Sequence, residues 1–277
     1  MLLDAHVHIF PPEFISQRER LVKEEPFFAL LYADPASVIV SHETMLKHME
    51  RDGVNSVWAV GFSWQLEKNA RTHNDYLLQV AREYPDKVSS FAACWPMAAW
   101  AHDEAKRVLE LGASGLGELA FYDQDIDLKH MAPLCGLCAA YNVPLMLHVN
   151  EPLGRMYAGK SPMGLSNSFN LLKQNPECNF ILSHLGGGIF FYKLLIPRQI
   201  ENAFDNLWLD TAATPFLYQP QAIKLAVELL GADRILLGCD YPLLPMKRTL
   251  TLIQQAELSR AELEMVCSGS ALRLLGN

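Results

Sequence analysis

The chain has 277 residues, of which 50% are hydrophobic and 19% are charged. This length is enough to bury a large core, so folding does not depend on disulfide or metal staples. Acidic residues outnumber basic ones by 31 to 23, which gives a net charge of −8 and argues against general binding to nucleic-acid backbones.

The N-terminal segment is not expected to act as a targeting signal. The first ten residues, MLLDAHVHIF, contain no Lys or Arg and are interrupted by Asp4, His6 and His8, unlike a signal or transit peptide. No run approaches the roughly 18 apolar residues of a membrane span. We therefore expect a cytoplasmic protein without a membrane partner. In that compartment its six cysteines are expected to be buried thiols; they are Cys94, Cys135, Cys138, Cys178, Cys239 and Cys267.

Short apolar runs alternate with helical patterns along the chain. Eight runs have the length and composition of strands buried on both faces of a parallel sheet: Leu2–Ile9, Ser56–Gly61, Val88–Cys94, Gly115–Phe121, Val143–Val149, Phe180–His184, Leu207–Thr211 and Ile235–Asp240. Amphipathic stretches typical of helices separate or follow them: Asn69–Tyr84, Asp103–Leu111, Leu128–Tyr141, Gln221–Leu230, Lys247–Leu258 and Arg260–Leu275.

This alternation predicts an α/β fold, a (β/α)₈ TIM barrel in which residues 1–277 form a single domain. A doubly wound open sheet is the alternative, but no glycine-rich phosphate loop follows the first run. Two long connections, Pro11–Pro35 and Asn150–Ser168, follow the first and fifth runs. Loops of this length in compact domains are usually functional, and the loops after barrel strands form the active-site face.

Ionisable residues stand in or at the ends of these apolar runs. His6 and His8 are two apart, so both point to one face of a strand. Four further residues end the fourth, fifth, sixth and eighth runs: Glu118, His148, His184 and Asp240. Burying any of them alone would cost several kcal/mol, whereas the rim of one barrel brings all six together. Four imidazoles and two carboxylates form a site for Zn²⁺ or a similar divalent metal ion.

Each of these residues also has a structural interpretation. Glu118 and Asp240 would then cap turns, and His148 and His184 would be satisfied core histidines. A structural role for all six residues is the weaker interpretation, because six independent coincidences would be needed to place them in or at the ends of the apolar runs. The other histidines have charged neighbours and are expected to be solvated surface residues; they are His42, His48, His73, His102 and His130.

The loop after the fifth run supplies candidate substrate-binding residues. Arg155, Tyr157 and Lys160 follow His148 closely. An arginine can hold a substrate carboxylate in bidentate fashion, with a lysine as a second charge; ordinary solvated loop charges are the alternative. Aromatic residues after the second, third and fourth runs either wall a pocket or pack in the core; they are Phe62, Trp64, Trp95, Phe121 and Tyr122.

These motifs resemble the amidohydrolase superfamily, in its amidohydrolase-2 or amidohydrolase-related branch. The matching segments are His6-Val-His8, His148, His184-Leu-Gly-Gly and Gly238-Cys-Asp240-Tyr-Pro. The resemblance implies a distorted TIM barrel that binds one or two divalent ions. It implies His6, His8 and Asp240 as ligands of a first ion, and His148 and His184 as ligands of a second where one is present.

The resemblance leaves the reaction open between two activities. Some two-metal hydrolases of this superfamily bridge their ions with a strand-four carboxylate, so Glu118 favours a metal-dependent hydrolase of a small amide, ester or lactone. In that reaction Asp240 takes a proton from water, and His184, if it is not a ligand, steadies the oxyanion. The decarboxylases of this branch typically hold one ion with the His-x-His pair, the strand-five His and the strand-eight Asp. In them the strand-six His, here His184, acts as acid or base.

Metal-dependent decarboxylation of an aromatic or enolic acid is therefore the alternative, and a non-catalytic metal-binding barrel is a second one. An anionic small-molecule substrate is expected in either enzyme. The sequence leaves the oligomeric state open, including a homo-oligomer.

Overall fold

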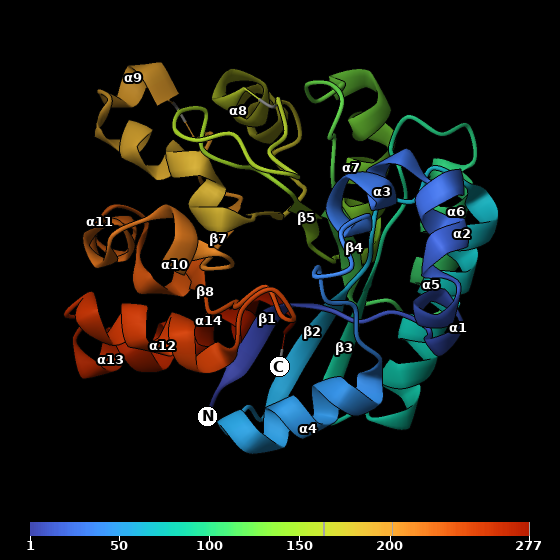
Figure 1. Ribbon diagram of the computed structural model, residues 1–277. Coiled ribbons are helices and arrows are strands. Elements are labelled where there is room, and N and C mark those ends of the chain that lie inside the picture. Colours follow the sequence, from blue (N-terminus) through green and yellow to red (C-terminus); the bar gives the residue numbers. More distant parts are fainter. Residues whose placement is uncertain (163, 201, 277) are drawn as a thin grey trace.

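The computed structural model describes residues 1–162, 164–200 and 202–276. Eight parallel strands form one sheet in the order β1 to β8: β1 (Leu3–His8), β2 (Ser56–Val60), β3 (Val88–Ala92), β4 (Gly115–Leu119), β5 (Leu145–Leu147), β6 (Phe180–Leu182), β7 (Leu207–Asp210) and β8 (Ile235–Leu236). The segment after β8 closes the ring against β1 through a bridge between Val7 and Tyr241. The predicted TIM barrel is thereby confirmed (Figure 1).

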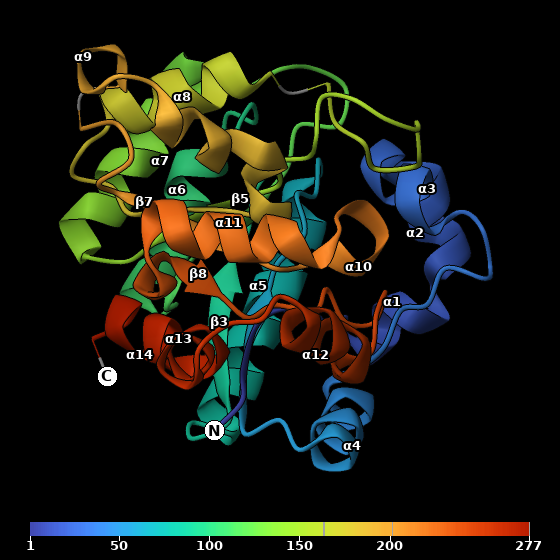
Figure 2. The same cartoon turned by 90° about the vertical axis from the view of Figure 1, so that its left-hand side faces the viewer.

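Helices lie around the outside of the barrel in both views (Figures 1 and 2). The longer ones are α4 (His42–Asp52), α5 (Glu67–Glu83), α6 (Ala101–Glu110), α7 (Leu128–Tyr141), α8 (Leu165–Gln174), α11 (Pro220–Leu230) and α12 (Met246–Gln255). The shorter ones are α9 (Pro197–Ile200), α10 (Thr214–Leu217), α13 (Arg260–Glu264) and α14 (Ser270–Leu274). Among the described residues, no helix has both the length and the apolar character that a bilayer crossing needs.

The first long connection is helical, which the sequence did not predict. It folds into α1 (Pro12–Ser16), α2 (Arg18–Glu24) and α3 (Pro26–Tyr32). Proline stands at the start of α1 and of α3, where its missing N–H costs nothing. These short helices bury Phe14, Phe27 and Phe28 against aromatic residues of the barrel rim. The segment is therefore a packed cap beside the barrel mouth rather than an open loop.

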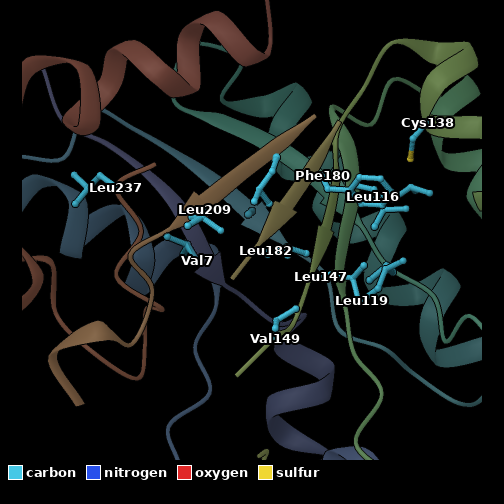
Figure 3. Close-up of a cluster of buried hydrophobic side chains, with 14 of the residues drawn as sticks. Val7, Leu116, Leu119, Cys138, Leu147, Val149, Phe180, Leu182, Leu209 and Leu237 are labelled. Atoms are coloured by element: carbon cyan, nitrogen blue, oxygen red, sulfur yellow. The ribbon is translucent and has the colours of Figure 1, made fainter. Parts of the chain in front are cut away.

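Alternate strand residues face the barrel interior. Trp58, Phe91 and Met146, from three different strands, pack together inside the ring. Their neighbours Val57 and Leu147 belong to the layer between the strands and the helices. Figure 3 shows that outer layer, in which strand side chains lie with Cys138 of α7.

Register shifts in two strands turn ionisable side chains toward the barrel interior. In β1 the register shifts between Asp4 and Val7, so that Ala5 packs inside the barrel whereas Val7 packs outside. His6 and His8 consequently face the interior. In β4 the register shifts between Leu116 and Leu119. Because both leucines pack outside, Glu118 faces the interior.

A left-handed turn follows β6 and sets the position of His184. Positive φ angles run from His184 to Gly188. A Cβ atom on Gly187 would lie 2.4 Å from the carbonyl oxygen of Asn150, so this position requires glycine. Gly187 therefore lies tightly against the loop after β5.

Candidate metal centre

The six ionisable residues expected at strand ends converge at the C-terminal mouth of the barrel. Their ligand atoms form two groups, in each of which all atoms lie within 4.8 Å of one another: His6, His8 and Asp240, and Glu118, His148 and His184. The Asp240 side chain, at 14% exposure, and the His8 and His148 side chains, at 11%, are the most accessible of the six. The cluster is therefore nearly shielded from bulk water.

Glu118 belongs to the second group and also reaches the first. Its Oε2 atom is 3.6 Å from the Nε2 atoms of both His6 and His8. Its Oε1 atom is 3.1 Å from His148 Nδ1 and 3.7 Å from His184 Nε2. One carboxylate thus faces both groups, one oxygen to each.

In the first group two imidazole nitrogens face each other. His6 Nδ1 donates to Asp210 Oδ2 at 2.8 Å, which leaves the lone pair of a neutral His6 on Nε2. That atom is 3.1 Å from His8 Nε2. Asp240 Oδ1 completes the group, 3.8 Å from His6 Nε2 and 3.6 Å from His8 Nε2. Nitrogen and carboxylate atoms brought together in this way fit a divalent cation.

The second group repeats this arrangement. His148 Nε2 donates to the carbonyl oxygen of Gly159 at 2.9 Å, and His184 Nδ1 donates to that of Ala212 at 3.0 Å. Because carbonyls only accept, the lone pairs of the neutral rings lie on His148 Nδ1 and His184 Nε2. These atoms are 3.2 Å apart and both face Glu118. Either a second cation or a shared proton satisfies such a group.

Asp210, which the sequence analysis missed, orients both groups. Besides His6 Nδ1 on its Oδ2 atom, it accepts the backbone N–H groups of His184 and Ala212 on Oδ1, at 2.8 and 3.0 Å. A carboxylate behind a ligating imidazole fixes its tautomer and raises its basicity. Asp210 ends β7, so the rule that identified the other strand-end residues would have found it as well.

The buried charges of the cluster balance one another. Burial lowers the pKa of His6, but the Glu118 and Asp210 carboxylates outweigh burial and hold this pKa well above its usual range. Burial raises the pKa of Glu118, but His6 and His148 outweigh it and hold this pKa well below its usual range. In His8 burial outweighs the neighbouring carboxylates, and the pKa of this residue is lowered.

A cavity of about 1050 Å³ opens above the cluster. Five of the six cluster residues line it: His8, Glu118, His148, His184 and Asp240. Among its walls are Leu31 and Tyr32 of α3 and Phe216 of α10. Figure 2 shows α3 next to the loop between β5 and α8, where Gly159 packs against Leu31. The cap and this loop together bound the mouth.

The three expected substrate-binding residues differ in their surroundings. Arg155 is exposed and lines the cavity. Tyr157 also lines the cavity, but its hydroxyl donates to Glu151 at 3.1 Å. Lys160 is not among the described lining residues: its Nζ donates to Glu151 at 3.0 Å and to the Leu153 carbonyl at 2.8 Å. These two bonds connect parts of the loop. The Lys160 ammonium, which we expected to meet a substrate, is paired with the Glu151 carboxylate instead.

Two other expectations about side chains change. His48 and His73, expected on the surface, are buried, with exposures of 4% and 0%. His73 accepts from Trp64 Nε1 at 2.9 Å and donates to the Ile9 carbonyl at 2.7 Å, so its helix face is internal despite charged neighbours. His102 and His130 are exposed as expected, and His42 is half-buried. All six cysteines are buried and unpaired, as predicted.

The aromatic residues considered as pocket walls divide into two sets. Phe62 and Tyr122 line the cavity. The other three are not among the described lining residues and pack elsewhere; they are Trp64, Trp95 and Phe121. Both interpretations made from the sequence therefore hold, each for some of the residues.

Known proteins with a similar sequence include decarboxylases. The chain is 24% identical to the gamma-resorcylate decarboxylase of Polaromonas sp., with 84% of this chain and 82% of the relative covered. It is 26% identical to the enzyme of that name from Rhizobium sp., with 72% and 76% covered.

Solved structures share the fold of this chain, and a family model matches its sequence. 5-Carboxyvanillate decarboxylase from Sphingomonas paucimobilis matches 99% of this chain with 98% of its own, at 18% identity and a TM-score of 0.77. A 2,6-dihydroxybenzoate decarboxylase in complex with 2,6-dihydroxybenzoate matches 100% of this chain with 98% of its own, at 21% identity and a TM-score of 0.72. The model of the amidohydrolase family matches residues 3–276. The resemblance inferred from the strand-end motifs is confirmed, and this chain is a member of the amidohydrolase family.

Proposed function

We propose that this chain is a metal-dependent decarboxylase of a small aromatic acid. The observation that carries the proposal is the group formed by His6, His8 and Asp240 at the floor of a partly aromatic cavity. The similarity to decarboxylases of gamma-resorcylate and 5-carboxyvanillate favours this reaction over the hydrolysis that Glu118 suggested.

The residues of the first group fit one divalent ion. His6 Nε2, His8 Nε2 and Asp240 Oδ1 are its proposed ligands, and Glu118 Oε2 lies next to them. A divalent ion in this group supplies a Lewis acid that polarises the oxygens of a bound acid. The identity of the ion stays open between zinc, which the donor set suits, and manganese, which a dihydroxybenzoic acid decarboxylase from Polaromonas contains.

The second group is proposed to hold a proton in place of a second ion. In decarboxylation the bond between the ring carbon and the carboxylate breaks, CO₂ leaves, and a proton binds the ring carbon. His184 borders the cavity, and its Nε2 atom faces His148 Nδ1 and Glu118 Oε1. Because His184 lines the cavity beside Glu118, it is the proposed general acid. Asp240, exposed to the same cavity, is the other candidate for proton transfer.

Hydrolysis remains a second candidate because of the position of Glu118. Its two oxygens face the two groups separately, as a carboxylate bridging two ions would. A hydrolase of this kind is expected to bind two ions and to cleave a lactone, ester or amide. The number of ions per chain therefore separates the two reactions.

An assay of metal content and product tests the proposed reaction. Protein loaded with Mn²⁺ or Zn²⁺ should hold one ion per chain and release CO₂ from a hydroxylated aromatic acid, and the His6→Ala/His8→Ala double variant should lose both ion and activity. Elemental analysis and CO₂ detection measure the two quantities. Two ions per chain with hydrolysis of a lactone or amide, and no CO₂ from any aromatic acid, would contradict the proposal.

Asp210→Asn should weaken metal binding without removing a ligand. The amide cannot accept the His6 Nδ1 proton as a carboxylate does, so the ring loses orientation and basicity; the metal dissociation constant should rise by about 10- to 100-fold. Competition with a chelator measures this change. Asp205→Asn, on an exposed residue shortly before β7, is the matched control. Equal metal affinity in both variants would show that Asp210 does not tune the ligand.

Arg155 is proposed to bind the carboxylate of the substrate, since it is the one Lys or Arg among the described residues lining the cavity. Arg155→Lys removes the planar pair of donors. It should raise KM by about 10- to 100-fold, because a hydrogen bond to a charged group is lost, while kcat holds. Steady-state kinetics measure both values, with Arg260→Lys, 92% exposed, as control. An unchanged KM would make Arg155 a solvated loop residue.

A further inference from the structure

Two tyrosines bring hydroxyl groups to the cavity wall and are not used by the proposed chemistry. Tyr32 ends α3, and Tyr122 follows β4 by three residues. Both line the cavity. Neither hydroxyl has a hydrogen-bond partner within the part of the chain that the structure describes, whereas the Tyr157 hydroxyl in the same cavity is bonded to Glu151.

Aromatic packing fixes both rings. The Tyr32 ring lies 4.8 Å from Phe28 and 5.5 Å from Phe10 between centroids. The Tyr122 ring lies 5.4 Å from Phe27. Phe62 joins the two, at 6.1 Å from Tyr32 and 6.3 Å from Tyr122. The hydroxyls are therefore held in place by rigid neighbours, which is what a preorganised binding group requires.

The hydroxyls lie close to the candidate metal centre. The Tyr122 ring is 5.4 Å from the ring of His148. Both hydroxyls lie within electrostatic range of the Glu118 and Asp240 carboxylates and of each other. Tyr32, Tyr122 and the ring of Phe62 thus form one stretch of the cavity wall beside the candidate metal centre.

The chemistry of this wall selects a ligand with both an aromatic ring and an oxygen acceptor. A ligand binds more weakly if it displaces water from a phenol in a shielded pocket without accepting the phenol's hydrogen bond. A site built in this way rejects analogues that lack the acceptor. We propose that Tyr32 and Tyr122 are specificity-determining residues that donate hydrogen bonds to a hydroxyl substituent on the ring of the aromatic acid.

This inference rests on the proposed function for the class of ligand but not on turnover, so it is tested by binding. The probes are 2,6-dihydroxybenzoate, which a structural neighbour binds, and benzoate, which has the ring and the carboxylate but no hydroxyl. Calorimetry on the metal-loaded protein gives the dissociation constant of each probe. The wild type should prefer 2,6-dihydroxybenzoate.

Tyr32→Phe and Tyr122→Phe keep the packed rings and remove only the hydroxyls. Each should weaken binding of 2,6-dihydroxybenzoate by about 2- to 12-fold, the range for one neutral hydrogen bond, and leave benzoate unchanged. Tyr141→Phe, at a half-exposed position outside the described cavity lining (38% exposure), should change neither. Thermal melting of each variant checks that the fold is intact.

The outcomes separate this inference from the proposed reaction. In one outcome the two variants lose the preference for 2,6-dihydroxybenzoate over benzoate while no aromatic acid releases CO₂. That result would support the proposed role of the tyrosines and contradict the proposed decarboxylase activity. If CO₂ is released but the variants lose the same affinity for both probes, or lose none, the proposed role of the tyrosines is overturned and the proposed reaction is not. A wild type that does not distinguish the two probes would overturn it as well.

Discussion

The closure of the barrel between β1 and the segment after β8 is the constraint on which the candidate site depends. Two hydrogen bonds make this seam next to the ligands: the Asp240 amide donates to the His6 carbonyl at 3.0 Å, and the His8 amide donates to the Tyr241 carbonyl at 2.7 Å. The same backbone contacts that complete the fold therefore place the Asp240 carboxylate beside the two imidazoles. Residues more than 230 positions apart in sequence become neighbours without any flexible loop between them.

Buried polar groups behind the proposed ligands keep this arrangement in place. Asp4 is fully buried below the histidines, where its carboxylate accepts the backbone N–H groups of Cys239 and His6 at 3.0 and 3.2 Å. Asp210 links His6 to the turn that carries His184. Ionisable side chains on rigid strands, each supported by a hydrogen-bonded neighbour, are what a precise metal site needs.

Periodicity and strand-end chemistry predict most of this architecture from the sequence. The eight strands follow from short apolar runs, the residues of α7 from an amphipathic stretch, and the six-member cluster from ionisable residues in or at the ends of the apolar runs. The register shifts in β1 and β4 do not, since a bulge depends on the neighbouring strand and leaves the apolar pattern of its own strand intact. The shift in β1 decides that His6 and His8 face the interior.

The remaining differences have similar causes. His73 was misjudged because its charged sequence neighbours occupy the other faces of α5, while helix geometry turns His73 itself toward Trp64 and Ile9. The cap formed by α1, α2 and α3 was missed because each helix is only five to seven residues long. Such helices are stabilised by tertiary packing rather than by propensity, and here the packing is aromatic. The reaction depends on where the cap and loops place substrate, which strand patterns do not encode.

The most direct test of this account is the position of the metal. Anomalous scattering from crystals of the Mn²⁺-loaded protein locates bound ions without an assay. The account predicts a peak at the barrel mouth within about 2.3 Å of His6 Nε2, His8 Nε2 and Asp240 Oδ1, the range of metal–ligand bonds in such sites. A metal-loaded crystal with no peak between these atoms, or with a peak bound by other residues alone, would contradict it.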